Sequence, residues 1–189
     1  GQDGIFFMEG ATLLSSPNVG AGDIFILGAG RDTIVAADIS VATPLNLDAD
    51  GDLIISALVQ TTGVGSDIVL VADRDADGRG GVLVDPAGQV DSANQLSIQG
   101  SDLILSPGVL DSVAIAGNGG DQITAAADTE IISGVNAPAG ADVIVNGNVN
   151  VGGRLRVDAE NDIQLAADLT AVGDLAVQDN LHLFTDVTI

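Results

Sequence analysis

The segment Ala141-Asp142-Val143-Ile144-Val145 returns as Asn161-Asp162-Ile163-Gln164-Leu165, and this recurrence decides the fold. In both copies an Asp precedes aliphatic residues that alternate along the chain. Alternation with a period of two predicts a short β-strand with one buried face. The unit appears again as Gly51-Asp52-Leu53-Ile54-Ile55, with Asp52 following Asp32 at the same interval, so the recurrence extends into the N-terminal half.

The repeat keeps a spacing of about 20 residues along most of the chain, within the range typical of solenoid repeats. Asp102, Asp121, Asp142 and Asp162 follow one another at nearly this interval. The equivalent aliphatic positions are Ile34 and Ile54, Val35 and Ile55, Ile39 and Val59, Leu103 with Val143 and Ile163, Leu105 with Val145 and Leu165, and Leu155 and Leu175. Short strands that repeat in register predict an all-β fold, a parallel β-helix or β-solenoid with coils of about 18–21 residues.

Residues 1–189 are predicted to form a single solenoid segment of roughly nine coils, because no linker divides the repeat. The Asp- and Gly-rich residues 73–94 interrupt the spacing and predict the longest coil or an external loop. Hydrophobic residues make up 46% of the chain, yet it has no Trp, Tyr or Cys and only four Phe. An interior filled by Val, Ile, Leu and Ala suits a narrow core better than the thick core of a globular domain.

The chain is strongly acidic, with 24 Asp and three Glu against five Arg and no Lys, and a net charge of −22. Asp prefers turns, so we expect these acids at the corners between strands. The charge argues against a nucleic-acid partner and against an anionic membrane surface. No apolar run is long enough to predict a membrane span. The acidity is compatible both with divalent-cation binding and with a saline habitat.

Residues 154–177, followed by 181–189, resemble the repeats of filamentous-haemagglutinin-type exoproteins in their succession of aliphatic, Asp, aliphatic, Ala and Asp residues. The resemblance implies a right-handed β-helix in a large, secreted bacterial surface protein. It also implies a structural or adhesive function, with cell-surface or matrix ligands as partners.

The run Asp73-Arg74-Asp75-Ala76-Asp77-Gly78 matches the first half of an EF-hand loop, in which alternating carboxylates bind calcium. The twelfth position is Val84, and Asp85 follows one residue late. Asp73, Asp75, Asp77 and Asp85 are therefore candidate calcium ligands, and calcium is the one cofactor the sequence suggests. The alternative is a solvated acidic turn. Both interpretations also apply to the related run at residues 46–52.

Three segments match the core of a calcium-binding nonapeptide, Gly-x-Gly-x-Asp-x-aliphatic, at residues 28–34, 63–69 and 117–123. They are isolated rather than tandem, and an ion would lie between consecutive copies, so glycine-rich corners are the favoured interpretation. Asn146, Asn148 and Asn150 alternate along another segment and predict either a structural strand or a polar face for a partner.

We predict no enzymatic activity. A β-helical polysaccharide-degrading enzyme normally carries aromatic platforms for sugars, and the chain has neither Trp nor Tyr. His182 lies between two leucines on an alternating segment, which predicts a solvent-facing side chain. A calcium-dependent surface-layer or matrix protein is the main alternative function, and a polysaccharide-degrading enzyme is the less favoured one.

The two ends hold three of the four Phe, in Ile5-Phe6-Phe7-Met8 and in Leu181-His182-Leu183-Phe184, and neither has a capping helix. Uncapped solenoid ends expose unpaired backbone groups that template further strands. We therefore expect the partners to be neighbouring coils of a longer chain or identical subunits that stack end to end into a filament.

Overall fold

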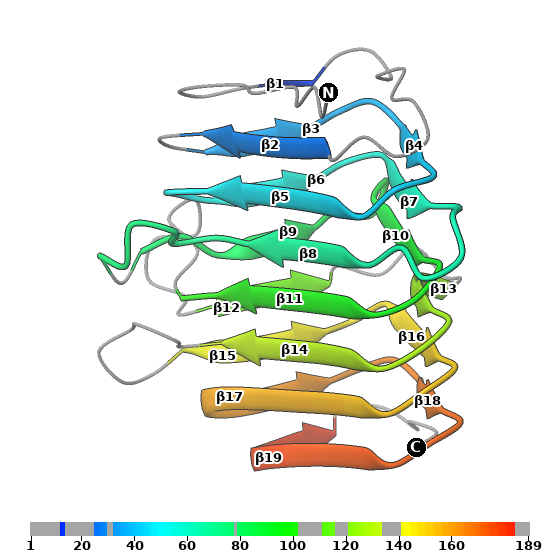
Figure 1. Cartoon of the computed structure of the whole chain (residues 1–189). Helices are drawn as coiled ribbons and strands as arrows, with labels where there is room; N and C mark the ends of the chain where they lie inside the picture. The colour runs from blue at the N-terminus through cyan, green and yellow to red at the C-terminus, as the bar shows by residue number, and fades with distance from the viewer. Residues whose placement is uncertain are drawn as a thin grey trace.

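In the computed structural model every described element is a β-strand, and the strands pair in parallel (Figure 1). The structure describes residues 12–13, 25–29, 32–77, 79–101, 111–115, 121–133 and 141–183. Within these ranges there is no helix, and hence none that is long and apolar enough to cross a membrane. The predicted all-β class and parallel strand pairing are confirmed.

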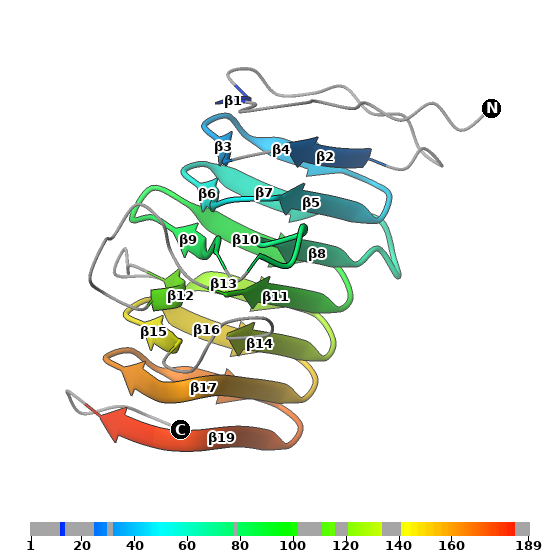
Figure 2. The ribbon, with the colours of Figure 1, turned by 90° about the vertical axis from the view of Figure 1, so that its left-hand side faces the viewer.

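The strands lie in three stacks, which the chain visits in turn (Figures 1 and 2). The first stack consists of β2 (Phe25–Ala29), β5 (Leu45–Ala49), β8 (Ile68–Val71), β11 (Leu96–Gly100) and β14 (Thr129–Ser133). The second consists of β1 (Thr12–Leu13), β3 (Thr33–Val35), β6 (Leu53–Ile55), β9 (Val82–Val84), β12 (Asp111–Ile115) and β15 (Asp142–Val145). The third consists of β4 (Ile39–Val41), β7 (Leu58–Thr61), β10 (Gln89–Ser92), β13 (Asp121–Ala125), β16 (Asn148–Val151) and β18 (Leu169–Ala171).

Two long strands, β17 (Leu155–Leu165) and β19 (Leu175–Leu183), run through both the first and the second stack. They join these stacks into a 13-stranded sheet, while the third stack is a separate six-stranded sheet. Each strand pairs with its counterpart one coil later. The equivalences predicted from the repeat are confirmed for Ile34 and Ile54, Val35 and Ile55, Ile39 and Val59, Val143 and Ile163, Val145 and Leu165, and Leu155 and Leu175.

The predicted coil length of about 18–21 residues, typical of solenoid repeats, holds at the two ends of the described region and is wrong between them. Phe25 pairs with Leu45, and Leu155 pairs with Leu175, so these two coils have the predicted length. The coils between them are all longer, since the successive register partners are Leu45 with Ile68, Ile68 with Leu96, Leu96 with Thr129, and Thr129 with Leu155.

Most of the extra length is inserted at one corner, between the first and the second stack. Three residues, 50–52, connect β5 to β6 there. Ten residues, 72–81, connect β8 to β9, ten connect β11 to β12, and eight connect β14 to β15. Insertion at a corner leaves the strand pairing on either side intact. Residues 73–94 thus comprise most of the first such connection, followed by β9 and β10.

One predicted register is corrected by these insertions. Val143 pairs with Val113 of β12 and not with Leu103, which lies ten residues earlier and outside the described residues. Likewise Asp121 begins β13 in the third stack, so it is not the counterpart of Asp142 in the second. The prediction of roughly nine coils involves parts of the chain outside the described ranges, and the segment Ile5-Phe6-Phe7-Met8 also lies outside them.

The inward-facing residues of the strands form one narrow aliphatic core. In β5, for example, Leu45, Leu47 and Ala49 are buried while the residues between them are partly exposed. Each fully buried Val, Leu or Ile side chain contributes about 1.5–3 kcal/mol relative to full exposure. Polar inward side chains occur near the strand ends, where the hydroxyl group of Thr61 donates a hydrogen bond to the backbone oxygen of Ser66 at 2.9 Å. Small aliphatic residues fill this interior, as expected from the scarcity of aromatic residues.

Candidate functional site

At the corners, Asp and Asn side chains accept hydrogen bonds from the backbone of the next coil. In each of these corner caps the donor is the N–H group of the equivalent residue one coil later. The donor–acceptor distances are 2.9–3.3 Å for Asp32 with Asp52, Asp38 with Leu58, Asp52 with Gly81, Asp67 with Gln95, Asp128 with Arg154, Asp142 with Asp162, and Asn148 with Asp168.

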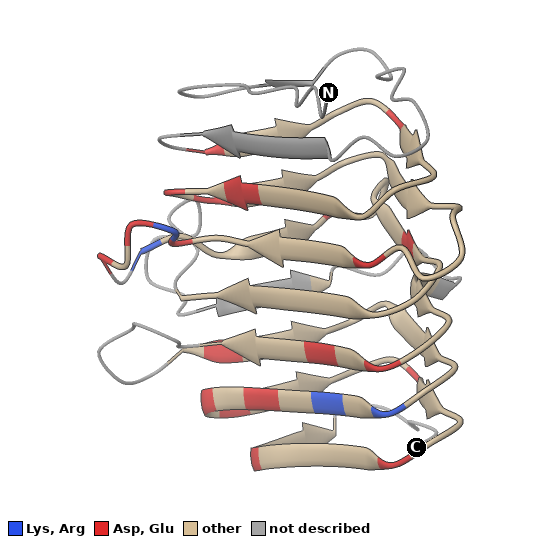
Figure 3. Ribbon diagram, viewed as in Figure 1, with Lys and Arg blue, Asp and Glu red and all other residues tan. Residues whose placement is uncertain are grey.

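The corner caps explain why the sequence repeats an Asp before each aliphatic run. A backbone N–H group that is left unpaired in a buried setting costs about 1–3 kcal/mol, and a charged acceptor forms a stronger bond than a neutral one. Figure 3 shows acidic residues both at the corners and on strands such as β14 and β17, so the prediction that acids lie at corners holds for only part of them. In every cap the acceptor belongs to the earlier coil and the donor to the later one, so the caps have a direction along the stack.

Residues 72–81, here called the acidic excursion, contain three of the four predicted calcium ligands. One carboxylate oxygen from each of Asp73, Asp75 and Asp77 lies within 4.8 Å of the other two. Calcium–oxygen distances are about 2.3–2.6 Å, so oxygens on opposite sides of one ion are about 5 Å apart. The three carboxylates are therefore close enough to share one cation. Gly78, which completed the sequence motif, lies outside the described residues.

The three carboxylates differ in exposure. Asp73 is only 3% exposed, and its Oδ2 atom accepts a hydrogen bond of 2.6 Å from the hydroxyl group of Ser101. Its backbone has a positive φ of 57°, a conformation that Asp adopts more readily than most residues. Asp75 and Asp77 are exposed. The excursion thus presents two solvated carboxylates beside one that is held in place.

The fourth predicted ligand, Asp85, is not part of this group. Strand β9 carries the chain away from the excursion before Asp85 is reached. There its carboxylate accepts hydrogen bonds from the hydroxyl group of Ser56 and from the N–H groups of Ala87 and Gly88. Asp85 therefore stabilises the turn between β9 and β10.

Arg74 attaches the acidic excursion to the preceding coil. Its guanidinium group lies 2.8 Å from the carboxylate of Asp48 and 2.6 Å from that of Asp50. Burial raises the pKa of Asp48, which the charge of Arg74 opposes and that of Asp50 reinforces. At its other end the excursion is held by the corner cap from the fully buried Asp52 to Gly81.

The other predicted calcium motifs have structural roles where they are described. In the run at residues 46–52, Asp48 and Asp50 both bind Arg74, whereas Asp52 is a corner cap, so the three carboxylates do not form one cluster. In the segment at residues 63–69, a Cβ atom on Gly63 would lie 2.0 Å from the backbone oxygen of Ala42, so the corner requires glycine. The segments at 28–34 and 117–123 lie partly outside the described residues.

The remaining sequence candidates lie on strands or next to them. His182 is exposed, as predicted, and its Nε2 atom is 3.3 Å from the carboxylate of Asp162. Asn148 is a corner cap, whereas Asn146 and Asn150 are exposed. The Asn segment therefore combines a structural residue with polar residues on the surface.

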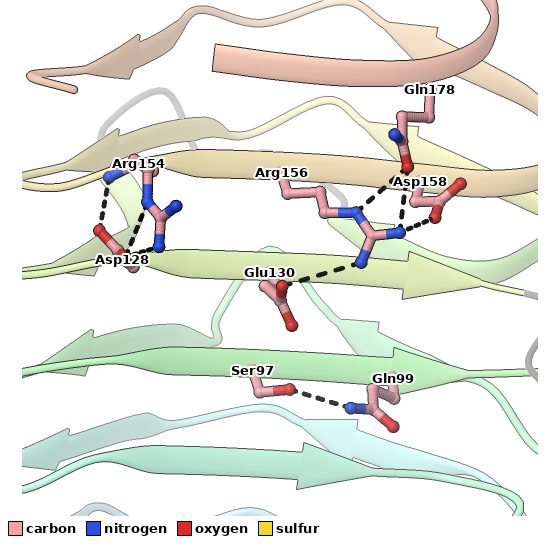
Figure 4. A network of polar contacts seen from close by, with 8 residues as sticks. All are labelled: Ser97, Gln99, Asp128, Glu130, Arg154, Arg156, Asp158 and Gln178. Carbon is pink, nitrogen blue, oxygen red and sulfur yellow. Dashed lines mark hydrogen bonds and ion pairs between the residues drawn. The ribbon is translucent and has the colours of Figure 1, made fainter. Parts of the chain in front are cut away.

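A surface network on the first stack was not anticipated from the sequence (Figure 4). Arg156 lies opposite Glu130 in the strand register, with 3.7 Å between Nη1 and the carboxylate, and also contacts Asp158 and Gln178. The separation of Glu130 and Arg156 along the chain is set by a corner insertion that has no sequence period. Only the strand register could have revealed this pair.

A second ion pair of the network lies at the corner before these strands. The guanidinium group of Arg154 is 2.6 Å from the carboxylate of Asp128, which also caps the backbone of Arg154. These hydrogen bonds lower the pKa of Asp128 and raise that of Arg154. Two open hollows of about 300 and 250 Å³ flank the pair. Because the guanidinium groups are paired with carboxylates, this surface offers little net positive charge to an anionic ligand.

Comparisons of the chain with protein-family models, with curated proteins and with solved structures find no match.

Proposed function

We propose that the chain is a segment of a right-handed parallel β-solenoid with a structural or adhesive, non-catalytic role in a large secreted bacterial surface protein. The main observation behind the proposal is that acidic side chains hold neighbouring coils together. Six Asp join one coil to the next. One of these six, Asp128, also binds Arg154, and other Asp bind Arg74 and Arg156. Acidic groups used in this way build a scaffold.

The strand directions support a right-handed solenoid. In Figure 1 the first-stack strands lie in front and point to the left, the second-stack strands lie behind, and the chain descends from β2 to β19. Viewed from the β2 end along the axis of the stack, the chain therefore runs clockwise as it moves away from the observer, and such a path is right-handed. This hand is also the one that nearly all parallel β-crossovers adopt.

The resemblance to filamentous-haemagglutinin-type repeats supports the proposed location at the cell surface. The high negative charge supports it too, because it keeps a β-rich extracellular protein soluble. In this function the stack is a rigid spacer, whose length grows by about 4.8 Å with each coil. Ligands on the cell surface or in the matrix would bind to its sides.

Two experiments test the proposal. Antibodies raised against the chain should label intact cells of the source organism, and labelling only after permeabilisation would refute a surface location. The purified chain should also release no reducing ends or unsaturated products from a panel of neutral and acidic polysaccharides. Turnover of any of these substrates would refute the scaffold function and support a β-helical enzyme instead.

A calcium-dependent surface-layer or matrix protein is the second candidate, favoured by the proximity of the carboxylates of Asp73, Asp75 and Asp77. In that function the ion would rigidify the acidic excursion. The two candidates share the solenoid and differ in whether calcium changes its stability.

A further inference from the structure

An open trough runs along the third stack and crosses four neighbouring strands, β7, β10, β13 and β16, which lie at the right of Figure 1. Its volume is about 530 Å³, larger than either hollow beside Arg154. Because neighbouring strands are about 4.8 Å apart, the trough extends for about 14 Å along the axis of the stack. This axial trough is lined by two columns of residues, Asp91, Thr124 and Asn150 in one and Ala93, Ala126 and Gly152 in the other.

The column of small residues creates the depression. Ala93, Ala126 and Gly152 each directly follow a strand of the third stack, so they occupy equivalent positions one coil apart. The same position holds Thr62 in the coil before them and Val172 in the coil after them, and both of these side chains are exposed. The axial trough is therefore a stretch of three coils with a methyl group or a hydrogen atom at this position, bounded by a larger side chain at each end.

The polar column offers hydrogen-bonding groups at the period of the coils. Asp91, Thr124 and Asn150 are register partners on neighbouring strands. The hydroxyl group of Thr124 donates a hydrogen bond of 2.8 Å to the carboxylate of Asp91. Asn150 is exposed, and no described residue forms a hydrogen bond with its side-chain amide. A hydroxyl group and an amide each donate and accept, so the column suits a ligand whose own groups do both.

The axial trough is nearly uncharged, on a chain with a net charge of −22. Among the described residues that line it, Asp91 is the single charged one, and none is an Arg. An anionic ligand would be repelled by the protein as a whole and would meet no cation in the trough. A cationic ligand would be attracted by carboxylates over much of the surface and not to this place in particular. The lining therefore favours an uncharged ligand that is rich in hydroxyl groups.

The period of the axial trough favours a sugar chain over a peptide. In an extended peptide the rise is about 3.3 Å per residue, so side chains on one face are about 6.6 Å apart and lose register with coils spaced by about 4.8 Å. A sugar ring is close in length to one coil step, so successive rings of an extended glycan meet equivalent positions. The methyl groups of Ala93 and Ala126 would contact the C–H groups of the rings.

We propose that the axial trough binds an uncharged linear polysaccharide that lies along the axis of the solenoid, with sugar hydroxyl groups hydrogen-bonded to Thr124 and Asn150. This inference rests on the proposed adhesive function and names its ligand. The chain has no Trp or Tyr to stack on a sugar, so each ring binds weakly. An adhesive scaffold tolerates weak contacts because several rings, and several copies on one surface, engage the same polymer together.

Two matched pairs of variants test the proposal on the whole chain. Ala126→Phe fills the axial trough, and Ala87→Phe adds the same side chain at an exposed position in the turn between β9 and β10. Asn150→Ala removes one hydrogen-bonding group from the trough, and Asn146→Ala removes the same group from an exposed position outside it. Titration calorimetry measures the Kd for hexasaccharides of β-1,4-linked glucose, mannose and xylose, with hexagalacturonate as the anionic probe. Circular dichroism shows whether each variant is folded.

We expect at least one neutral hexasaccharide to bind the wild type, Ala87→Phe and Asn146→Ala with the same Kd. Asn150→Ala should raise this Kd by about 3- to 10-fold, the effect of losing one hydrogen bond, and Ala126→Phe by at least about tenfold. The proposal is refuted if no neutral probe binds, if hexagalacturonate binds as tightly, or if the members of each matched pair behave alike. Such a failure leaves the proposed surface location standing, because antibody labelling of intact cells tests that location separately.

Discussion

Replacing Asp52 by Ala should remove the most deeply buried of the corner caps. Asp52 is 0% exposed, and its carboxylate accepts the N–H group of Gly81 at 3.0 Å. A hydrogen bond to a charged group contributes about 1.5–3 kcal/mol, and a buried N–H group left without an acceptor costs about 1–3 kcal/mol. Both free energies describe the loss of the same hydrogen bond and are not added together. We therefore expect Asp52→Ala to destabilise the surrounding coils by about 2–3 kcal/mol.

The loss is best measured locally, since repeat proteins need not unfold in one step. A change of about 2–3 kcal/mol should accelerate native-state exchange of the Gly81 amide by about 30- to 150-fold. Asp52→Asn keeps an oxygen acceptor and should lose about half as much free energy, because a neutral acceptor forms a weaker bond.

Asp75→Ala is the matched control for charge. It also removes one negative charge, but from an exposed position, and should change stability by less than about 0.5 kcal/mol. If Asp52→Ala and Asp75→Ala leave the Gly81 amide equally protected, corner caps do not stabilise the stack.

Calcium distinguishes the two candidate functions. In a calcium-dependent protein, a calcium concentration near 100 times the Kd stabilises the fold by about 2.7 kcal/mol. Asp75→Ala should abolish most of this stabilisation. Equal melting temperatures in calcium, in chelator and in sodium chloride of matched ionic strength eliminate that function. Strand alternation predicts that Leu169→Ala, at a buried position, costs about 2–5 kcal/mol in urea unfolding, while Thr170→Ala at the next, exposed position costs about 0.5 kcal/mol or less. Because hydrogen bonds from Arg154 hold the pKa of Asp128 low, its contribution to stability is present above the unfolded-state pKa and is lost as the pH falls through the folded-state value. Arg154→Gln should therefore raise the pKa of Asp128 in an NMR titration, and an unmoved titration curve would show that the ion pair does not form in solution.

The acidic excursion shows which part of the candidate calcium site could be predicted from a local sequence motif. Alternation placed Asp73, Asp75 and Asp77 together, and the structure brings their carboxylate oxygens within 4.8 Å of one another. It does not bring Asp85 to them, because β9 intervenes and aliphatic burial directs that strand into the second stack. The local backbone brings the side chains of nearby residues together, whereas the position of Asp85 depends on where the next strand packs.

The sequence by itself determined the strand class, the inward and outward faces, and the pairing of coils with regular spacing, such as Ile34 with Ile54 and Val145 with Leu165. These properties are local, because a side chain's face follows from a period of two and a constant repeat keeps the register. Only the tertiary structure decided that β12 starts at Asp111 and pairs with β15. Insertions at a corner carry no period, so the register after them depends on which strands best bury their aliphatic faces together. For the same reason the ion pair of Glu130 with Arg156, and the Asp carboxylates that cap the following coil, became visible only once the stack was assembled.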